Sequence, residues 1–270
     1  MDDNDLLKQM VEVEFSEREY CCEGRFVPGW SVIETCEPQC KRRLVHEHME
    51  RIQFHIPREY WFANFNQFDS TGQDRHETAE RQKALDVAIR YTTMFKEAHA
   101  EGFAPLFYGP FGTGKSLLAS CILWRASKDG YSIKLRTFAE IMQIIKAGFR
   151  EPVMENGSEV NLDREMVNTD FYCVDDIGRH TSPSHSDFAD RELDRLISHR
   201  LSCNRPTIIT TNLGADEVSD IANGHVMSRI GGKCVAISVP GQDFRINIQK
   251  PRLKQKLFSD TPSQGVHSSE

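Results

Sequence analysis

The sequence predicts an α/β fold in which helices cover both faces of a mostly parallel sheet of five strands. Strand-like apolar runs alternate with helical periodicity over most of the chain, and this alternation is typical of parallel sheets. The second observation is GPFGTGKS (Gly109–Ser116), a G-x-x-x-x-G-K-[ST] motif that follows one such run and precedes a helix. In that context the motif forms a phosphate-binding loop. The expected architecture is therefore a three-layer P-loop fold.

Five segments carry the strand pattern, namely 102–109, 131–138, 170–176, 205–212 and 234–241. Helical spacing is found before and between them, over 78–99, 115–130, 137–149 and 186–201. The segment 61–77 is aromatic first and polar afterwards, which indicates a connection anchored to the core.

The chain of 270 residues, 39% of them hydrophobic, is long enough for one sizeable domain and an appendage. We expect a Cys-rich head over 1–60, a core over 61–250, and a basic then disordered tail over 251–270. No apolar run approaches the roughly 20 residues of a membrane helix, and the acidic N-terminus lacks a secretory pattern, so a cytoplasmic protein is expected. The net charge of −7 argues against indiscriminate coating of DNA.

The phosphate loop predicts a site for ATP and Mg²⁺. Its glycines let the backbone fold tightly around phosphates, and the following helix presents its positive end. Lys115 is expected to reach the β- and γ-phosphates, and the Ser116 hydroxyl to ligate Mg²⁺. The residues assigned to nucleotide binding are Gly109, Pro110, Phe111, Gly112, Thr113, Gly114, Lys115, Ser116 and Asp175.

Two adjacent aspartates end the apolar run FYCVDD (Phe171–Asp176). Asp175 fits a second Mg²⁺ ligand, the simpler alternative being a polar cap at a strand end. Asp176 stands where a catalytic base would polarise the attacking water. Its carboxylate is one methylene shorter than that of glutamate, and a misplaced base is costly in rate. Hydrolysis is therefore expected to be slow, which suits a switch better than a motor.

Three later residues are further catalytic candidates. Asn212 ends a buried strand, where its amide can contact the γ-phosphate and the water; a turn-forming Asn is the alternative. Arg229, in HVMSRIGG, is a candidate finger for a neighbouring subunit's site, and a solvated arginine at a helix end is the alternative. Arg245, in GQDFR, is a candidate phosphate sensor in its own subunit, although the chain after it is too short for a full helical lid.

The motifs GPFGTGKS, AEIMQIIKAGFR, CVDDIG, RPTIITTN, HVMSRI and GQDFR occur in this order. Together they resemble the AAA+ ATPases of the DnaC/DnaI-type replicative helicase loaders, over about Trp61 to Arg245. The resemblance implies a weak, DNA-stimulated ATPase that self-associates through its ATPase domain and delivers a hexameric replicative helicase onto single-stranded DNA. His225 is a departure, because the family often has a second basic residue there.

Four cysteines, Cys21, Cys22, Cys36 and Cys40, fall within twenty residues near the N-terminus. The segment is similar to the zinc-bearing head of many loaders, which would grip the helicase. The first pair is adjacent and lacks the usual C-x-x-C spacing, although His46 or His48 can supply a replacement ligand. A zinc site and four reduced thiols both remain open.

A DNA-facing surface is predicted at KAGFR, where Lys146 and Arg150 flank Phe149. Basic and stacking side chains together hold single-stranded nucleic acid, and the resemblance implies that this helix lines the DNA side of the assembly. Without the resemblance, a helix C-terminus with favourable basic charges and a core Phe is the simpler interpretation.

Two other functions share these motifs. One is an IstB-type ATPase that assists a transposase, although a Cys-rich head favours the loader. The other is an ATP-dependent adaptor that neither hydrolyses ATP nor binds DNA, and an ATPase assay with and without single-stranded DNA separates it from the others.

Overall fold

The structure is a computed structural model that describes residues 52, 54–61, 63–149, 151–155, 157–178, 183–218, 225–246 and 250–251. Five strands form its main sheet: β1 (Ala104–Tyr108), β2 (Ile133–Thr137), β5 (Phe171–Ile177), β6 (Thr207–Thr211) and β7 (Cys234–Ser238). Neighbouring strands are all parallel and follow the order β2-β5-β6-β1-β7. The predicted α/β class and its five strands are confirmed.

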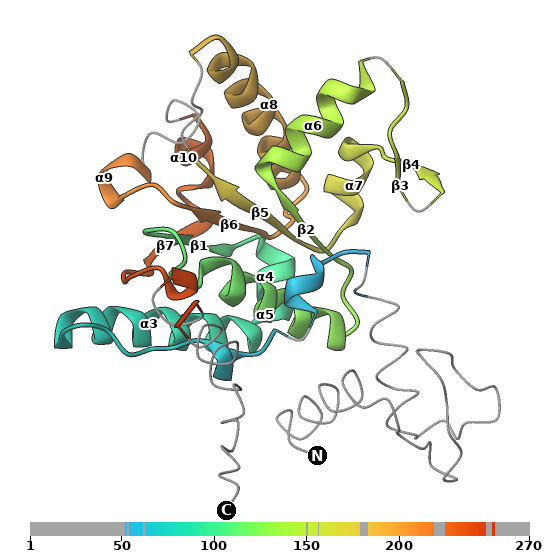
Figure 1. Cartoon of the computed structure of the whole chain (residues 1–270). Helices are drawn as coiled ribbons and strands as arrows, with labels where there is room; N and C mark the ends of the chain where they lie inside the picture. The colour runs from blue at the N-terminus through green and yellow to red at the C-terminus, as the bar shows by residue number, and fades with distance from the viewer. Residues whose placement is uncertain are drawn as a thin grey trace, which may run out of the picture.

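Helices cover both faces of this sheet (Figure 1). One face carries α3 (Arg75–Thr92), α4 (Phe95–Glu101) and α5 (Lys115–Lys128), and the other carries α6 (Phe138–Gly148), α7 (Leu162–Asn168) and α8 (Pro183–Ser202). Successive strand residues point to opposite faces, so Phe171 packs in the first layer and Tyr172 in the second. The three-layer arrangement expected from the alternation is therefore present.

The strand order brings distant segments together at one edge of the sheet. Strand β6 lies between β1, which leads into the phosphate loop, and β5, which carries the two aspartates. In an open parallel sheet, ligands bind outside the carboxyl ends of the strands where the chain reverses its direction across the sheet. The loop, the aspartates and the residue that follows β6 meet at this end of the strands.

The segment before Trp61 runs along the free edge of β2. The backbone N–H of Leu135 donates to the carbonyl oxygen of His55 (2.8 Å), and Lys134 Nζ donates to that of Phe54 (2.8 Å). Ile52 and Ile56, which precede Trp61, are buried in the core layer beside α5. Two short 3₁₀ turns, η1 (Arg58–Tyr60) and η2 (Phe65–Gln67), then lead towards α3.

Several short elements were not predicted. They are the hairpin of β3 (Met154–Glu155) and β4 (Ser158–Glu159), helix α7, α9 (Ala215–Val218) and α10 (His225–Ile230). The hairpin and α7 are tied to β2 by Arg136, which bonds Glu155 (2.5 Å) and Glu165 (2.8 Å). Hydrophobic periodicity does not reveal elements of only two to seven residues. The ion pairs of the hairpin and of α7 are long-range contacts, which the local pattern does not show either.

Across the described ranges, we find no helix that combines the length and the apolar character needed to span a bilayer.

Candidate nucleotide site

The loop Gly109–Ser116 joins β1 to α5 through backbone conformations that require glycine. Gly112 has a φ of 69° and Gly114 a φ of 102°, a region that other L-residues rarely adopt. The space is closed as well. A Cβ on Gly112 would lie 2.0 Å from a carboxylate oxygen of Asp243, and one on Gly114 would lie 2.8 Å from the ring of Phe68. The loop thus curls tightly over the N-terminus of α5.

Lys115, the first residue of α5, is 5% exposed and folds back over the loop. Its Nζ donates to the carbonyl oxygens of Gly109 (2.8 Å) and Pro110 (2.6 Å). Burial lowers the pKa of Lys115 to about 8, while the charges of Asp176 and Asp175 act in the opposite direction. The ammonium is therefore held by neutral carbonyls, which phosphate oxygens can replace.

Ser116 and Asp175 come together although 59 positions separate them. The Ser116 hydroxyl donates to Asp175 Oδ1 (2.8 Å), and Asp175 is 6% exposed. Burial raises the pKa of Asp175, whereas hydrogen bonds from Thr210 and Ser116 lower it. Hydroxyl and carboxylate oxygens are the hard ligands that Mg²⁺ prefers. This donor set beside an anchored lysine fits a magnesium–nucleotide complex.

Asp176 adopts a left-handed backbone conformation with a φ of 58°, which is uncommon outside glycine although Asp and Asn tolerate it better than most. The pairing of β5 with β6 shifts register between Val174 and Ile177, so Asp176 lies at an irregularity in the ladder. Its exposed carboxylate accepts a hydrogen bond from Asn212 Nδ2. The predicted base and the predicted amide sensor therefore lie side by side.

Arg81, which the sequence interpretation missed, braces the loop from α3. Its guanidinium donates to the carbonyl oxygens of Asp69 (2.8 Å), Thr113 (3.3 Å) and Pro240 (2.6 Å), and lies 4.8 Å from the centre of the Phe68 ring. It is 6% exposed, and burial lowers its pKa. One side chain thus joins the incoming connection, the phosphate loop and the segment after β7.

Tyr60, in η1, is a second residue that the sequence did not reveal. Its hydroxyl is hydrogen-bonded to Ser116, and burial, followed by the charges of Glu59 and Asp175, raises its pKa. Nothing in the sequence signals this contact, because an aromatic residue in a connection is usually an anchor. The structure places the connection directly over the Ser116–Asp175 pair.

Arg245 lies beside the phosphate loop of its own chain. The backbone N–H of Phe244 donates to the Gly112 carbonyl (3.0 Å), and that of Arg245 donates to Asp243 Oδ1 (2.9 Å). The positive charge of Arg245 contributes to lowering the pKa of Lys115. Its exposed guanidinium is thus near enough to the loop for the predicted sensor position.

No protein-family model matches this chain. Over 156 residues, 58% of the chain and 60% of the relative, it is 30% identical to the replicative helicase loader DnaC of Escherichia coli K12. The crystal structure of the DnaC helicase loader covers 68% of this chain and 99% of that one, with a TM-score of 0.55 and 19% identity. The chain is therefore similar to the DnaC/DnaI helicase loaders in sequence and shares the fold of their AAA+ ATPase domain.

Further relatives agree with this DnaC/DnaI-like assignment. The replicative helicase loader DnaI of Bacillus subtilis is 25% identical over 196 residues, which are 71% of this chain and 58% of DnaI. The crystal structure of DnaI covers 68% of this chain and 94% of that chain, with a TM-score of 0.53 and 21% identity. The resemblance inferred from the order of the motifs is confirmed. The match spans about 60% of the length of E. coli DnaC.

Arg229 lies on α10 and contacts α8. Its Nε is 3.4 Å from Asp194 Oδ1, its Nη1 donates to Ser198, and the side chain is 52% exposed. The predicted finger is therefore at the surface. Its two contacts are with side chains of α8, and not with Lys115 or Asp175. His225, the departure from the family pattern, begins the same short helix.

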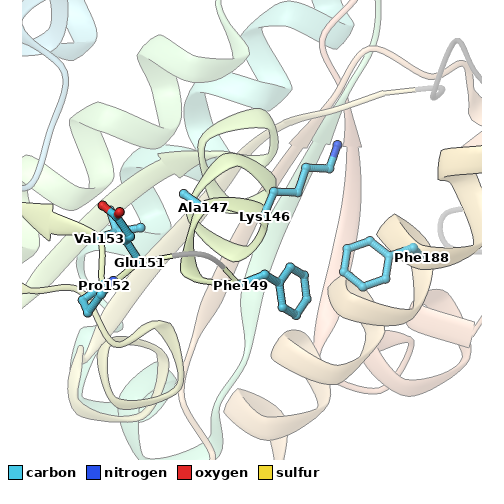
Figure 2. A pocket seen from close by; sticks show the side chains of 7 residues that line it. All are labelled: Lys146, Ala147, Phe149, Glu151, Pro152, Val153 and Phe188. Atoms are coloured by element: carbon cyan, nitrogen blue, oxygen red, sulfur yellow. The ribbon is translucent and has the colours of Figure 1, made fainter.

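The predicted DNA surface forms an open groove at the end of α6 (Figure 2). Phe149 is 73% exposed, and its ring centre lies 6.1 Å from that of Phe188 on α8, at an interplanar angle of 50°. Lys146 lines the same groove, as Figure 2 shows. The structure therefore adds Phe188 to the candidate residues, while Arg150 lies outside the described residues.

The predicted zinc ligands Cys21, Cys22, Cys36 and Cys40, and the alternatives His46 and His48, also lie outside the described residues. Among the residues that are described, no three or more His, Cys, Asp or Glu side chains cluster in a way that could hold a metal ion. The zinc site stays a prediction from the sequence.

Proposed function

We propose that this protein binds ATP with Mg²⁺ in the loop Gly109–Ser116. The observation that supports this most directly is the hydrogen bond from Ser116 to Asp175, beside a lysine whose Nζ donates to two carbonyl oxygens of the loop. Lys115 would exchange those carbonyls for phosphate oxygens, and Ser116 and Asp175 would hold the metal. When bound, Mg²⁺ supplies positive charge that offsets the charge of the phosphates.

The same site is proposed to hydrolyse ATP slowly. Asp176 would accept a proton from the attacking water. The Asn212 amide, which donates to Asp176, would orient that water. The short aspartate side chain limits how closely the base approaches. Arg245 would sense phosphate in its own chain, and Arg229 would act on a neighbouring subunit.

The wider role we propose is that of a loader, which delivers a hexameric replicative helicase onto single-stranded DNA while the nucleotide state controls the complex. The DnaC and DnaI relatives support this role. The Cys-rich head over 1–60 would grip the helicase, with one zinc per chain bound mainly by Cys22, Cys36 and Cys40. Elemental analysis of protein purified without chelator tests the metal, and a metal-free result would contradict it.

The groove at Phe149 is proposed to contact single-stranded DNA, with Lys146 attracting phosphates and the two phenylalanines offering faces for bases. Phe149→Ala and Lys146→Ala should each weaken binding of a labelled oligonucleotide in fluorescence anisotropy. Base stacking on an aromatic side chain is worth about 1–3 kcal/mol, so the Phe149→Ala affinity should fall roughly tenfold or more. Lys83→Ala, which removes an exposed lysine of α3, is the matched control.

The decisive experiment for the loader is retention of the replicative helicase on the tagged full chain, in the presence of ATP or of ADP, with and without single-stranded DNA. We expect retention that depends on the nucleotide, and loss of that dependence in Lys115→Ala. Absence of retention in every nucleotide state would contradict the loader role. Hydrolysis by the wild type in the same buffers would show separately that the chain is an ATPase.

A further inference from the structure

A single threonine hydroxyl joins the two acidic residues of the candidate site. Thr210 of β6 is 1% exposed. Its Oγ1 donates to Asp175 Oδ1 at 2.5 Å and accepts from the backbone N–H of Asp176 at 2.9 Å. A hydroxyl has one proton and two lone pairs, so these two bonds use the proton and one acceptor position.

The contact with Asp176 compensates for an irregularity of the sheet. The register of β5 against β6 shifts between Val174 and Ile177, and Asp176 has a φ of 58°. A residue at such an irregularity loses regular ladder pairing, and its N–H needs another hydrogen-bond partner. The Thr210 hydroxyl serves as that partner, and so stabilises the uncommon backbone conformation that directs the Asp176 carboxylate.

The contact with Asp175 links this conformation to the metal side of the site. Ser116 and Thr210 both donate to Oδ1 of Asp175, so two hydrogen bonds from different elements fix that carboxylate. On the other side, Asn212 donates to Asp176. The bonds form one path from Ser116 through Asp175 and Thr210 to Asp176 and Asn212.

We propose that Thr210 is a positioning residue for ATP hydrolysis, orienting Asp175 for Mg²⁺ and Asp176 for the attacking water. The proposal rests on the function proposed above and adds a residue and a role to it. Thr210 is hydrogen-bonded to both acidic residues, and would act by fixing their two carboxylates relative to each other. Its loss should therefore affect metal dependence and turnover together.

The neighbouring residue Thr211 shows what a purely structural threonine does here. It is fully buried on the same strand, and its hydroxyl donates to the carbonyl oxygen of Ile177 and accepts from the N–H of Leu213 (3.2 Å). Thr211 therefore has the same chemistry and burial but bonds backbone groups rather than either aspartate. Thr211→Val is the matched control for Thr210→Val.

The test compares the full-length wild type with Thr210→Val, Thr210→Ser and Thr211→Val. Three quantities are measured: steady-state ATP hydrolysis, binding of a fluorescent ADP analogue as a function of Mg²⁺ concentration, and unfolding in urea. In Thr210→Val we expect kcat to fall roughly 10- to 100-fold, because a misplacement of about 1 Å costs up to that much. The Mg²⁺ midpoint should rise roughly tenfold, since a buried carboxylate loses one hydrogen bond.

Thr210→Ser keeps the hydroxyl and should recover most of the turnover and the Mg²⁺ midpoint. Thr211→Val should lose stability similar to that lost by Thr210→Val, with kcat and the Mg²⁺ midpoint changed less than threefold. Equal effects of the two valine variants on kcat and the Mg²⁺ midpoint would overturn the proposal, as would failure of Thr210→Ser to restore either. If Thr210→Val does not fold, Thr210→Ala takes its place, because alanine also lacks the hydroxyl and is smaller than valine.

The outcome separates this proposal from the proposed function. A wild type that binds no nucleotide would refute the ATPase itself, whatever Thr210 does. A wild type that hydrolyses ATP, with Thr210→Val indistinguishable from it, would refute the role of Thr210 alone.

Discussion

The guanidinium of Arg229 on α10 lies against the carboxylate of Asp194 on α8, with 3.4 Å between Nε and Oδ1. The arginine is 52% exposed, and the aspartate 23%. Ion pairs at such a surface contribute about 0–1 kcal/mol. Releasing Arg229 from Asp194 to reach a neighbouring subunit would therefore cost little. The pair holds Arg229 against α8 of its own chain.

We expect Arg229→Ala to bind ATP normally but to fail to hydrolyse it, since its charge would act on the γ-phosphate of a neighbour. Mixing it with Lys115→Ala should restore part of the activity, because some interfaces then join an intact Arg229 to an intact loop. Steady-state ATPase measurements on each variant and on the mixture test this. Arg195→Ala, which removes another half-exposed, ion-paired arginine on α8, should stay active. A mixture that co-assembles and remains inactive would show that Arg229 acts within its own chain or is structural.

Lys115→Ala should abolish nucleotide binding, because the loop loses the cation that would face the β- and γ-phosphates.

The affinity of the wild type for nucleotide should also depend on pH. Burial lowers the pKa of Lys115 to about 8, so the side chain is charged below pH 8 and becomes neutral above it. Affinity for ADP should therefore be constant near pH 7 and fall roughly tenfold by pH 9, measured with a fluorescent analogue. Lys128→Ala, in the last turn of the same helix, should keep both the affinity and its pH dependence. An affinity that does not change over this range would show that Lys115 stays charged up to pH 9, whereas unchanged ADP affinity in Lys115→Ala would show that Lys115 does not bind the phosphates.

Asp176→Asn should leave ATP binding intact and reduce hydrolysis by roughly 100-fold or more, as expected for loss of a general base. Asparagine tolerates the left-handed backbone that Asp176 adopts, so this change removes the charge without straining the bulge. Binding and single-turnover hydrolysis measured on the same sample separate the two effects. Asp129→Asn, at the end of α5, is the control. Persistent turnover in Asp176→Asn would place the base elsewhere.

Arg81→Met should destabilise the protein by about 3 kcal/mol, because three carbonyl groups lose a charged donor in a buried setting. Since one of them belongs to Thr113, nucleotide affinity should fall as well. Urea unfolding gives the first quantity and fluorescent nucleotide binding the second. Arg90→Met, an exposed arginine on the same helix, should change neither. Equal stability losses in the two variants would mean that Arg81 does not brace the loop.

The local features of this protein follow from its amino-acid pattern. Strand and helix periods depend on residues a few positions apart, so the five strands and the helices α5, α6 and α8 follow from the pattern. The loop Gly109–Ser116 is equally local, because its glycines and its lysine act through the backbone between them. An apolar run that ends in two aspartates, in a chain that also carries such a loop, was enough to single out Asp175 and Asp176.

Contacts between distant side chains depend on how the helices and strands pack. Arg81 touches carbonyls 12, 32 and 159 positions away, Tyr60 reaches Ser116, and Phe188 approaches Phe149 from another helix. Thr210 could be found only after the strand order placed β6 beside β5 and the bulge set their register. A shift of one residue turns every side chain to the other face of a sheet. The link between Thr210 and the two aspartates is therefore a property of strand order and register, which no local pattern encodes.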